Sequence, residues 1–584
     1  KALKDLDKIK VNAYAGTGKT TTIRACAEAF EDKKILVLAF NRSIANELRE
    51  KLGSNCMANT IHGLACWLLG IDTSKIASEE VFLDELIKLF GDDYSIVKIY
   101  AHGFKAFCNS EFTELSEKNL VRLFWRNSYL RKQVLALFRE DDKSPKEVLQ
   151  EGAGELAERI KYIFDAIEKR KLPITHDYYL KVFQLRLKKF SNFFKKFYLL
   201  AIDEAQDLNG VQEYLLKHAP VPKKLAVGDK HQQIYSWRLA INSLARLKDW
   251  EEKYLTVSFR FQNEKIVDYA NKFLKNWKGE TKLLTAIKTG RKTGKTAIIS
   301  RTNAVLIREI ARINEKVSFT RKIHDIFRKV RESEKLKEYF STGNESYLKG
   351  LPYYVKKLAL EFKERARGLE EFANLFELAG EEEYARGIML AREYNIEELY
   401  EKAKRLEDPN AKLVLTTAHA SKGLEFDEVV LKEDFKPLEK VVALRILNEF
   451  GRGSIERLQE VVEGIKEFEE RLSEVIDEVN LYYVAWTRAL YEVIGEGASF
   501  VESSFEKVLD EDLLFREISV LMRRVSDGEK RCEGAYRLAT KFVEEVEKKT
   551  PESSQASEIV HNPQGNFLQR LIRLFQRLMW KTTS

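Results

Sequence analysis

A glycine-rich segment near the start of the chain has the pattern of a phosphate-binding loop. It reads AYAGTGKTT and lies between a segment that we expect to form a strand and one that we expect to form a helix. In such a loop, backbone N–H groups surround the phosphates of a nucleotide, and the helix N-terminus favours their negative charge. We expect Lys19 to reach the β- and γ-phosphate oxygens and the Thr20 hydroxyl to bind Mg²⁺. The segment predicts a nucleoside triphosphate site made of Ala13, Tyr14, Ala15, Gly16, Thr17, Gly18, Lys19, Thr20 and Thr21.

A second GKT sequence, at 294–296, does not meet the same requirements. The segment 290–296 is one residue short of the phosphate-loop spacing, and the strand-like residues 297–299 follow it instead of a helix. Without a helix N-terminus, nothing holds several N–H donors toward one phosphate. We interpret this segment as a solvated basic turn.

Two acids follow the apolar run at 198–202. Acids at the carboxyl end of a parallel strand lie where such sheets bind their ligands. We expect Asp203 to hold Mg²⁺, directly or through water, and Glu204 to orient and deprotonate an attacking water. An acidic turn that caps a helix is the alternative interpretation of DEAQD at 203–207.

A further loop, GDKHQQIYSWR, follows the apolar run at 224–227. Gln232 is suited to sensing the γ-phosphate or the bound water. Tyr235 and Trp237 offer flat surfaces for nucleic-acid bases, and Arg238 adds a charge beside them. Aromatic residues at this spacing also occur in protein cores, and this alternative stays open.

Continuous apolar runs of the kind buried in parallel sheets occur in two groups, and long charged segments with helical periodicity interrupt both groups. We therefore expect an α/β chain with two parallel-sheet motor domains, each carrying a mainly helical insertion. The expected boundaries are 1–70 and 191–254 for the first motor domain, 71–190 for its insertion, 255–302 and 411–500 for the second motor domain, 303–410 for its insertion, 501–549 for a helical extension, 550–565 for a flexible linker and 566–584 for an amphipathic basic tail helix.

The composition is typical of a globular protein in a reducing compartment. Of 584 residues, 44% are hydrophobic and 33% are charged, and no apolar run is long enough to span a bilayer. The five cysteines lack the spacing of metal ligands, which favours reduced thiols and an intracellular location, either the cytoplasm of a prokaryote or a nucleus. A net charge of +8 is compatible with a polyanionic partner.

The tail contains QRLIRLF at 569–575, which partly matches a sliding-clamp peptide. Gln576 replaces the second aromatic residue of that pattern. A membrane surface, another helix or another part of the same protein are alternative partners for this helix.

Seven motifs in a fixed order resemble those of superfamily 1 helicases of the UvrD/Rep class, and in wording they are similar to the F-box DNA helicase branch. We expect no F-box within this sequence. The motifs are LAFN at 38–41, TIHG at 60–63, DEAQD at 203–207, GDKHQQIYSWR at 228–238, SFR at 258–260, TTAHASKGLEFD at 416–427 and LYYVAWTRA at 481–489.

The resemblance implies two RecA-like domains and a role for each motif residue. Arg260 and Arg488 would be arginine fingers from the second domain, although each alone could be a salt-bridged surface arginine. Phe259 would lie against the adenine, and Glu425 would accept from the ribose hydroxyl. The residues implied to face single-stranded DNA are Phe40, Asn41, Thr60, His62, Tyr235, Trp237, Thr417 and His419, with Arg238 beside them.

One departure concerns the base of the nucleotide. The family usually carries a glutamine motif upstream of the phosphate loop, and residues 1–10 contain no glutamine. Because the sequence begins at Lys1, we expect that an upstream segment has been lost or that adenine specificity is relaxed.

The motifs predict an ATP- and Mg²⁺-dependent DNA helicase or translocase. The resemblance implies movement from 3′ to 5′, which the residues themselves do not indicate, and a role in DNA repair, recombination or replication. Alternatives are a nucleic-acid-stimulated ATPase that acts as a switch, and a binding module with a decayed motor. Intact residues at the nucleotide site argue against the last alternative. RNA is a weaker substrate hypothesis, because the GDxxQ loop lacks the LPP continuation of the Upf1-like RNA branch.

Overall fold

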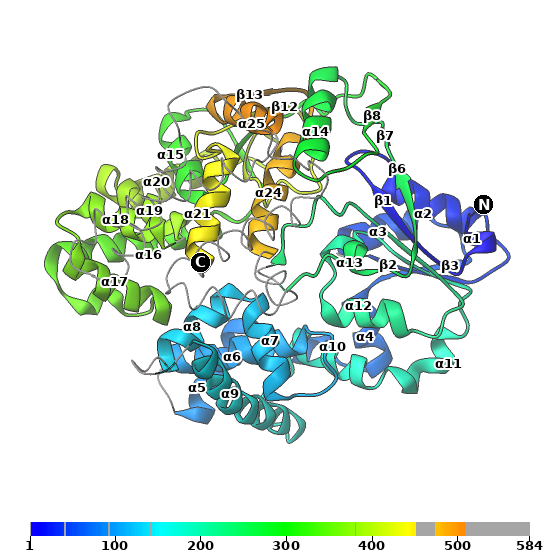
Figure 1. Ribbon diagram of the computed structural model, residues 1–584, viewed down its shortest axis with the longest axis horizontal. Coiled ribbons are helices and arrows are strands. Elements are labelled where there is room, and N and C mark those ends of the chain that lie inside the picture. Colours follow the sequence, from blue (N-terminus) through cyan, green and yellow to red (C-terminus); the bar gives the residue numbers. More distant parts are fainter. Residues whose placement is uncertain are drawn as a thin grey trace, which may run out of the picture. The chain divides into compact units, whose positions relative to one another are not determined.

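The computed structural model describes residues 2–39, 42–91, 94–138, 143, 145–236, 239–379, 381–450 and 473–507. The chain divides into two units (Figure 1). The first contains Lys1–Phe259 with Pro352–Tyr354, and the second contains Arg260–Leu351 and the described residues from Val355 onward.

The first unit is built on a six-stranded parallel sheet with the strand order β3-β2-β4-β5-β1-β6. The apolar runs predicted at 198–202 and 224–227 correspond to two of its central strands, β4 and β5. The strands are β1 (Lys8–Ala13), β2 (Ile35–Ala39), β3 (Cys56–Thr60), β4 (Leu199–Ile202), β5 (Lys223–Gly228) and β6 (Glu251–Leu255).

Alternating side chains of the central strands build a core on each face of this sheet. In β2, Ile35 and Val37 pack with apolar residues of α2 (Lys19–Glu28) and α3 (Arg42–Lys51). Leu36 and Leu38 belong to the core on the opposite face. That core includes residues of α4 (Ile61–Leu69) and α12 (Gly210–His218). A strand buried on both faces explains the unbroken apolar run in the sequence.

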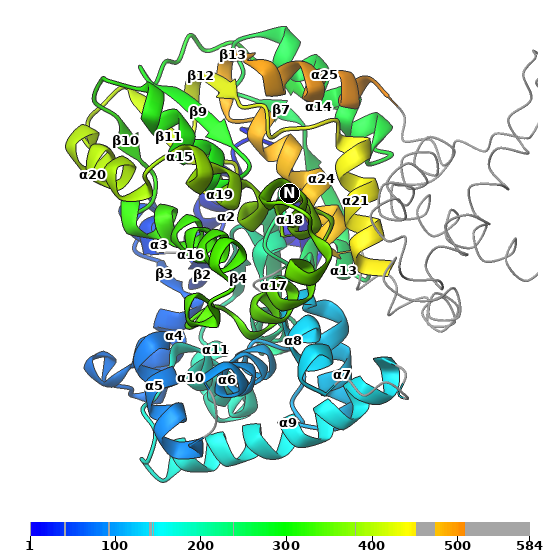
Figure 2. The same cartoon turned by 90° about the vertical axis from the view of Figure 1, so that its left-hand side faces the viewer.

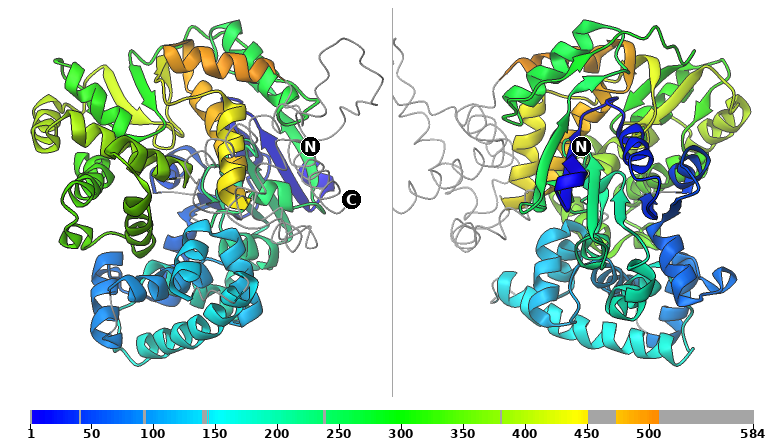
Figure 3. Two further views of the ribbon diagram at one scale, coloured as in Figure 1. Left: turned by 60° about the vertical axis from the view of Figure 1, so that its left-hand side comes forward. Right: turned by 90° about the vertical axis from the view of Figure 1, so that its right-hand side faces the viewer.

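The insertion of the first unit is helical, and its helices lie beside the sheet (Figure 3). The long cyan helix on the side of the insertion away from the sheet is α9. Short elements near the sheet are α1 (Ala2–Asp5), α11 (Ser191–Phe194), η3 (Ala205–Asp207) and α13 (Ser243–Arg246). The insertion helices are α5 (Glu79–Phe90), α6 (Tyr94–Cys108), α7 (Glu117–Arg126), α8 (Ser128–Phe138), α9 (Pro145–Glu168) and α10 (His176–Leu185).

The second unit contains a five-stranded parallel sheet with the order β10-β11-β9-β12-β13. Its strands are β9 (Thr296–Ser300), β10 (Ser318–Phe319), β11 (Leu413–Thr417), β12 (Phe426–Leu431) and β13 (Ala489–Ile494).

Helices of the second insertion lie next to this sheet (Figure 2). Apolar residues of α15, α16, α19 and α20 form one core with Leu415 of β11. The helices of the second unit are α14 (Glu264–Asn276), α15 (Asn303–Arg312), α16 (Ile323–Thr342), α17 (Tyr353–Arg365), α18 (Leu369–Leu378), α19 (Glu382–Glu393), α20 (Ile396–Leu406), α21 (Leu438–Phe450), α24 (Ser473–Trp486) and α25 (Glu496–Glu506).

The predicted α/β class with parallel sheets is confirmed. Leu255 ends β6 of the first sheet, so the division between the units comes later than the expected boundary after residue 254. Most of the expected extension at 501–549, the linker at 550–565 and the tail at 566–584, with its clamp-like peptide, lie outside the described residues. No described helix combines the length and apolarity needed to cross a bilayer.

Candidate nucleotide and DNA site

The predicted phosphate loop joins β1 to α2. Gly16 and Gly18 have φ angles of 73° and 84°, a left-handed conformation that glycine adopts without a steric penalty. Gly18 is the N-cap of α2, and no side chain caps that helix. The first turn of a helix has N–H groups without partners inside the helix, and they attract anions. The loop therefore has the backbone that a phosphate site requires.

Side chains from the ends of two strands meet at this loop. Lys19 Nζ lies 2.9 Å from Glu204 Oε2, and Thr20 Oγ1 donates to Asp203 Oδ2 at 3.2 Å. Asp203 and Glu204 directly follow β4. A hydroxyl and carboxylate oxygens are the hard donors that Mg²⁺ prefers, so Thr20 and Asp203 fit this ion.

The charges of this group shift two pKa values. Burial alone lowers the pKa of Lys19, but the carboxylates of Glu204, Asp229 and Asp203 outweigh it, and the pKa is raised. Burial, together with the charge of Glu204, raises the pKa of Asp203 to about 6, against the opposing effect of Lys19. Lys19 is thus held as a cation, and a bound metal ion would relieve the unfavourable burial of Asp203.

A buried amide, Gln206, connects the acidic loop to the loop after β5. Its Nε2 donates to Glu204 Oε2 at 2.6 Å, and its Oε1 accepts from the backbone N–H of Asp229 at 3.0 Å. Asp229 Oδ2 in turn accepts from Gln232 Nε2 at 2.7 Å. Gln206 and Asp229 were not among the predicted site residues, although Gln206 lies between acids in DEAQD. Glu204 has φ 53°, a left-handed conformation that a non-glycine residue adopts at a cost in energy.

Two aromatic residues flank the loop in the first unit. Tyr14 is fully buried, with its ring 6.0 Å from that of His231 and 6.2 Å from that of Tyr254. The backbone N–H of Phe259 donates to the carbonyl oxygen of Gly16 at 2.9 Å, and the side chain is 48% exposed. Phe259 thus lies beside the loop with a large exposed apolar side chain, as a base-stacking role requires.

In the second unit, Arg260 is tied to Glu425. Its guanidinium lies 2.8 Å from Glu425 Oε1 and donates to the carbonyl oxygen of Thr487 at 2.9 Å. The exposed Arg291 lies 2.8 Å from the other carboxylate oxygen. Burial raises the pKa of Glu425, but Arg260 and Arg291 outweigh this effect, and the pKa is lowered. Glu425 is therefore held as an anion.

Arg488 is 1% exposed. It donates through Nε to the carbonyl oxygen of Val484 at 2.9 Å, through Nη1 to that of Leu424 at 3.2 Å and through Nη2 to Thr487 Oγ1 at 3.1 Å. These bonds fix the guanidinium between α24 and the loop that carries Glu425. Arg488 is not a surface arginine in this unit.

The second GKT sequence forms a turn whose donors converge on a carboxylate of the same unit. The N–H of Thr293 donates to Asp427 Oδ1 at 2.6 Å, and that of Gly294 donates to Oδ2 at 2.9 Å. The expectation that nothing holds such donors together is wrong, because Asp427 gathers them. Its carboxylate occupies the place of an external anion, so the interpretation as a turn stands.

Of the described residues that are expected to face DNA, Thr60 and Thr417 each end a strand, one in each sheet. Thr60 ends β3, and its side chain accepts from the N–H of Gly63. His62 is partly buried, and burial together with the nearby His176 lowers its pKa to about 4. Tyr235 is also partly buried. Phe40, Asn41, Trp237 and Arg238 lie outside the described residues.

In the second unit, Thr417 ends β11 and is buried, and its hydroxyl accepts from the N–H of Ala420 at 3.4 Å. His419 lies just beyond it, and burial lowers its pKa to about 4. Both histidines, His62 and His419, are therefore neutral near pH 7. Neutral imidazoles would contact bases or sugars as hydrogen-bond partners and not as cations.

Curated proteins that resemble this chain are DNA helicases by name. F-box DNA helicase 1 of Gallus gallus is 26% identical over 520 residues, which are 82% of this chain and 46% of that protein. F-box DNA helicase protein 1 of Schizosaccharomyces pombe is 28% identical over 533 residues, or 83% of this chain and 55% of that protein. A probable DNA helicase II homolog of Mycoplasma genitalium is 26% identical over 40% of this chain and 35% of its own length. The chain thus spans about half the length of the F-box helicases.

Family models cover most of the described residues. The UvrD/REP helicase N-terminal domain matches residues 2–249, and the UvrD-like helicase C-terminal domain matches residues 157–494. The two parallel sheets are accordingly RecA-like motor domains. The chain belongs to the UvrD-like helicase family.

Proposed function

We propose that this chain is an ATP-driven DNA helicase or translocase that steps 3′ to 5′ along single-stranded DNA and unwinds duplexes. The observation that carries the proposal is the meeting of Lys19 with Glu204 and of Thr20 with Asp203 at the phosphate loop. This arrangement provides a cation for the phosphates, ligands for Mg²⁺ and a base for water.

The hydrolysis step uses residues of the first unit in defined roles. Lys19 binds the β- and γ-phosphate oxygens, for which it exchanges its present partner Glu204. Glu204 then accepts a proton from the attacking water, and Gln232 orients that water or the γ-phosphate. When bound, Mg²⁺ at Thr20 and Asp203 neutralises charge on the phosphates. Gln206 holds the acidic loop and the loop after β5 together through its hydrogen bonds to Glu204 and Asp229.

The second unit supplies most of the remaining groups in this proposal. Arg260 and Arg488 are the arginine fingers, and such charges change phosphoryl-transfer rates by about 10³- to 10⁵-fold. Glu425 of this unit accepts from the ribose hydroxyl, for which it must loosen its ion pair with Arg291, and Phe259 of the first unit stacks on the adenine.

Single-stranded DNA is the proposed track of the motor, and repair, recombination or replication is its proposed setting. The word "DNA helicase" in the names of the relatives supports DNA as the substrate. The proposed contacts are Phe40, Asn41, Thr60, His62, Tyr235, Trp237, Arg238, Thr417 and His419.

ATP turnover measured with and without single-stranded DNA tests the proposal, with Lys19→Ala as the inactive control. We expect turnover that rises severalfold or more with DNA and is absent in the variant. ATP turnover that is the same with and without single-stranded DNA would contradict a motor function. Stimulated turnover without unwinding would favour a translocase or a nucleic-acid-dependent switch.

A further inference from the structure

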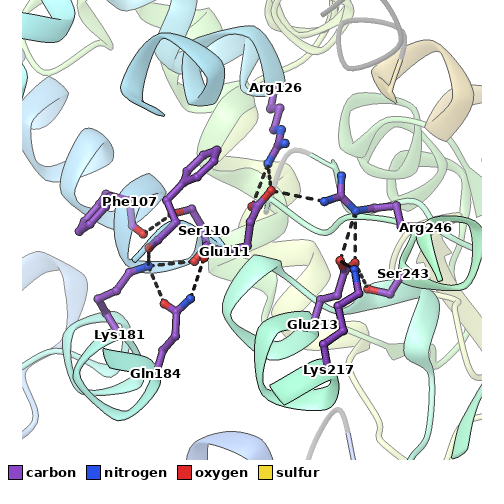
Figure 4. A network of polar contacts seen from close by, with 11 residues as sticks. Phe107, Ser110, Glu111, Arg126, Lys181, Gln184, Glu213, Lys217, Ser243 and Arg246 are labelled. Atoms are coloured by element: carbon purple, nitrogen blue, oxygen red, sulfur yellow. Dashed lines mark hydrogen bonds and ion pairs between the residues drawn. The ribbon is translucent and has the colours of Figure 1, made fainter. Parts of the chain in front are cut away.

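The turn at 109–112, between α6 and α7 of the first insertion, is held from inside the insertion by α10 (Figure 4). Lys181 Nζ donates to the carbonyl oxygens of residues 110 and 112, both at 2.8 Å, and to Gln184 Oε1 at 2.7 Å. Gln184 Nε2 donates to the carbonyl oxygen of residue 111 at 2.9 Å. A fully buried ammonium requires such partners, so α10 and the turn form one rigid piece.

The opposite side of the turn is tied to the motor domain by Glu111 (Figure 4). Its carboxylate lies 2.8 Å from Arg126 of α7 and 3.3 Å from Arg246 of α13. Arg246 also lies 3.2 Å from Glu213 of α12, which accepts from Ser243 Oγ at 2.9 Å. Glu111 thus links the insertion to two helices of the motor domain through one guanidinium.

The turn at 109–112 also contacts the motor domain through close backbone contacts. A Cβ on Gly210 would lie 2.2 Å from the backbone nitrogen of Glu111, so the two main chains touch. Asn209 Nδ2 donates to Asn109 Oδ1 at 2.6 Å, and the N–H of Val211 donates to the carbonyl oxygen of Asn109 at 3.3 Å. A movement of the turn therefore displaces the start of α12.

The residues that the turn contacts, 209–211, come just after the acidic loop, and residues 208 and 209 pair with residues that come just after the Gln232 loop. Leu208 and Asn209 follow the acidic loop at 203–207 directly. The N–H of Ile241 donates to the carbonyl oxygen of Leu208 at 2.8 Å, and Asn209 forms an antiparallel bridge with Ala240. These partners follow the loop that carries Gln232. The residues after the two loops are thus paired with each other, and Asn209 of this pair contacts the turn.

The other end of α10 contacts a residue of the proposed DNA face. The ring of His62 lies 6.2 Å from that of His176 and 6.2 Å from that of Tyr179. His176 Nδ1 and the Tyr179 hydroxyl are 2.9 Å apart. A continuous chain of contacts therefore runs from His62 through α10 and the turn to the exits of both loops.

We propose that Glu111 is a positioning residue that transmits the binding of DNA at the His62 face to the loops of Glu204 and Gln232. The inference rests on the proposed function, because it assigns a route by which DNA stimulates turnover. Burial raises the pKa of Glu111, but Arg126 and Arg246 outweigh it and lower the pKa, which keeps the carboxylate charged for both arginines.

The kinetic test uses Glu111→Gln, which keeps the shape and removes the charge, and Glu155→Gln as the matched control. Glu155 pairs with Tyr100 and Arg159 inside the insertion, away from the turn. We expect Glu111→Gln to lower the DNA-stimulated kcat roughly three- to tenfold, with DNA-free turnover and the KM for ATP unchanged. Arg246→Gln should give the same loss, and the double variant no further loss. An equal fall in basal and stimulated turnover, or no fall, would overturn the proposal.

A second measurement separates this inference from the proposed function. Hydrogen exchange of the nucleotide-free protein reports on amides 239–241 at the exit of the Gln232 loop. We expect faster exchange there in Glu111→Gln, with the strands of the first sheet unchanged and Glu155→Gln like the wild type. Unchanged exchange at 239–241 would reject the positioning role even in a protein without turnover. If DNA does not change wild-type turnover while Glu111→Gln exchanges faster, the proposed function and the transmission of DNA binding are both rejected, and only the positioning of the Gln232 loop by Glu111 stands.

Discussion

Lys19 Nζ and Glu204 Oε2 form a 2.9 Å ion pair between the loop after β1 and the loop after β4. The lysine proposed to bind phosphate and the acid proposed to activate water thus form an ion pair with each other. Both side chains are less than a quarter exposed, so the pair is shielded from solvent. In the proposed mechanism, nucleotide binding separates the two side chains, and Glu204 is freed only when phosphate replaces it at Lys19.

Replacing Glu204 by glutamine should therefore separate binding from turnover. We expect Glu204→Gln to bind ATP at least as tightly as the wild type, because Lys19 loses a competing anion. Turnover should fall by about 10²- to 10⁴-fold, the usual contribution of a general base. Equilibrium binding of a fluorescent ATP analogue and steady-state turnover measure the two effects. A variant that keeps more than a tenth of the turnover would exclude Glu204 as the base.

Replacing Asp203 by asparagine should act on the metal ion. The Mg²⁺-dependent gain in ATP affinity should fall about 10- to 100-fold, whereas affinity in EDTA stays the same or rises. Glu204→Gln is the matched control, since it removes the neighbouring charge and should keep the Mg²⁺ dependence. ATP binding measured across a Mg²⁺ titration compares the Mg²⁺ dependence of the two variants. Equal Mg²⁺ dependence in Asp203→Asn and the wild type would remove Asp203 from the metal site.

Arg260 and Arg291 share the carboxylate of Glu425, which allows a comparison within one ion-pair cluster. Arg260 has a side chain that is 10% exposed, and Arg291 has one that is 57% exposed. We expect Arg260→Ala to lower kcat by about 10³-fold with little change in ATP affinity, as for an arginine finger. Arg291→Ala should change kcat less than threefold, because exposed ion pairs contribute about 1 kcal/mol or less. Similar kcat values for the two variants would refute the assignment of Arg260.

The buried ammonium of Lys181 predicts a pH dependence of local stability. Burial lowers the pKa of Lys181 from 10.5 to about 7, with partial opposition from Cys108 and Glu111. Between these values the folded state binds fewer protons than the unfolded state, so the stability of α10 rises with pH. Relative to Lys181→Met, which has no such group, the free energy of opening of α10 should increase by on the order of 2 kcal/mol between pH 7 and 9.

Hydrogen exchange of the α10 amides, corrected for the intrinsic pH dependence of exchange, measures this difference. The comparison with Lys181→Met removes contributions from all other groups. Parallel curves for the two proteins from pH 7 to 9 would show that Lys181 titrates normally.

Much of the fold could be predicted because its central strands are buried on both faces. The apolar runs of β2, β4, β9 and β11 are visible in the sequence, whereas β3 and β6 lie at sheet edges and carry polar residues such as those in CMANT and EEKYL. An edge strand packs against fewer neighbours, so its sequence has a weaker apolar pattern.

The nucleotide site could be predicted in part for a related reason. The spacing in the phosphate loop is local, and acids after a parallel strand must lie at the same sheet edge. The bridge of Gln206 to Asp229 and the pair of Glu111 with Arg246 depend on side-chain directions and on contacts between distant segments. The second pair joins residues 135 positions apart. No local pattern in one sequence contains that information.

Unwinding of duplexes with a 3′ or a 5′ single-stranded tail, with Lys19→Ala as the control, tests the proposed motor most directly. The proposal predicts ATP-dependent unwinding of the 3′-tailed duplex and no unwinding by Lys19→Ala. Unwinding only from a 5′ tail would contradict the proposed polarity. ATP turnover without unwinding of either duplex would contradict the proposed helicase activity.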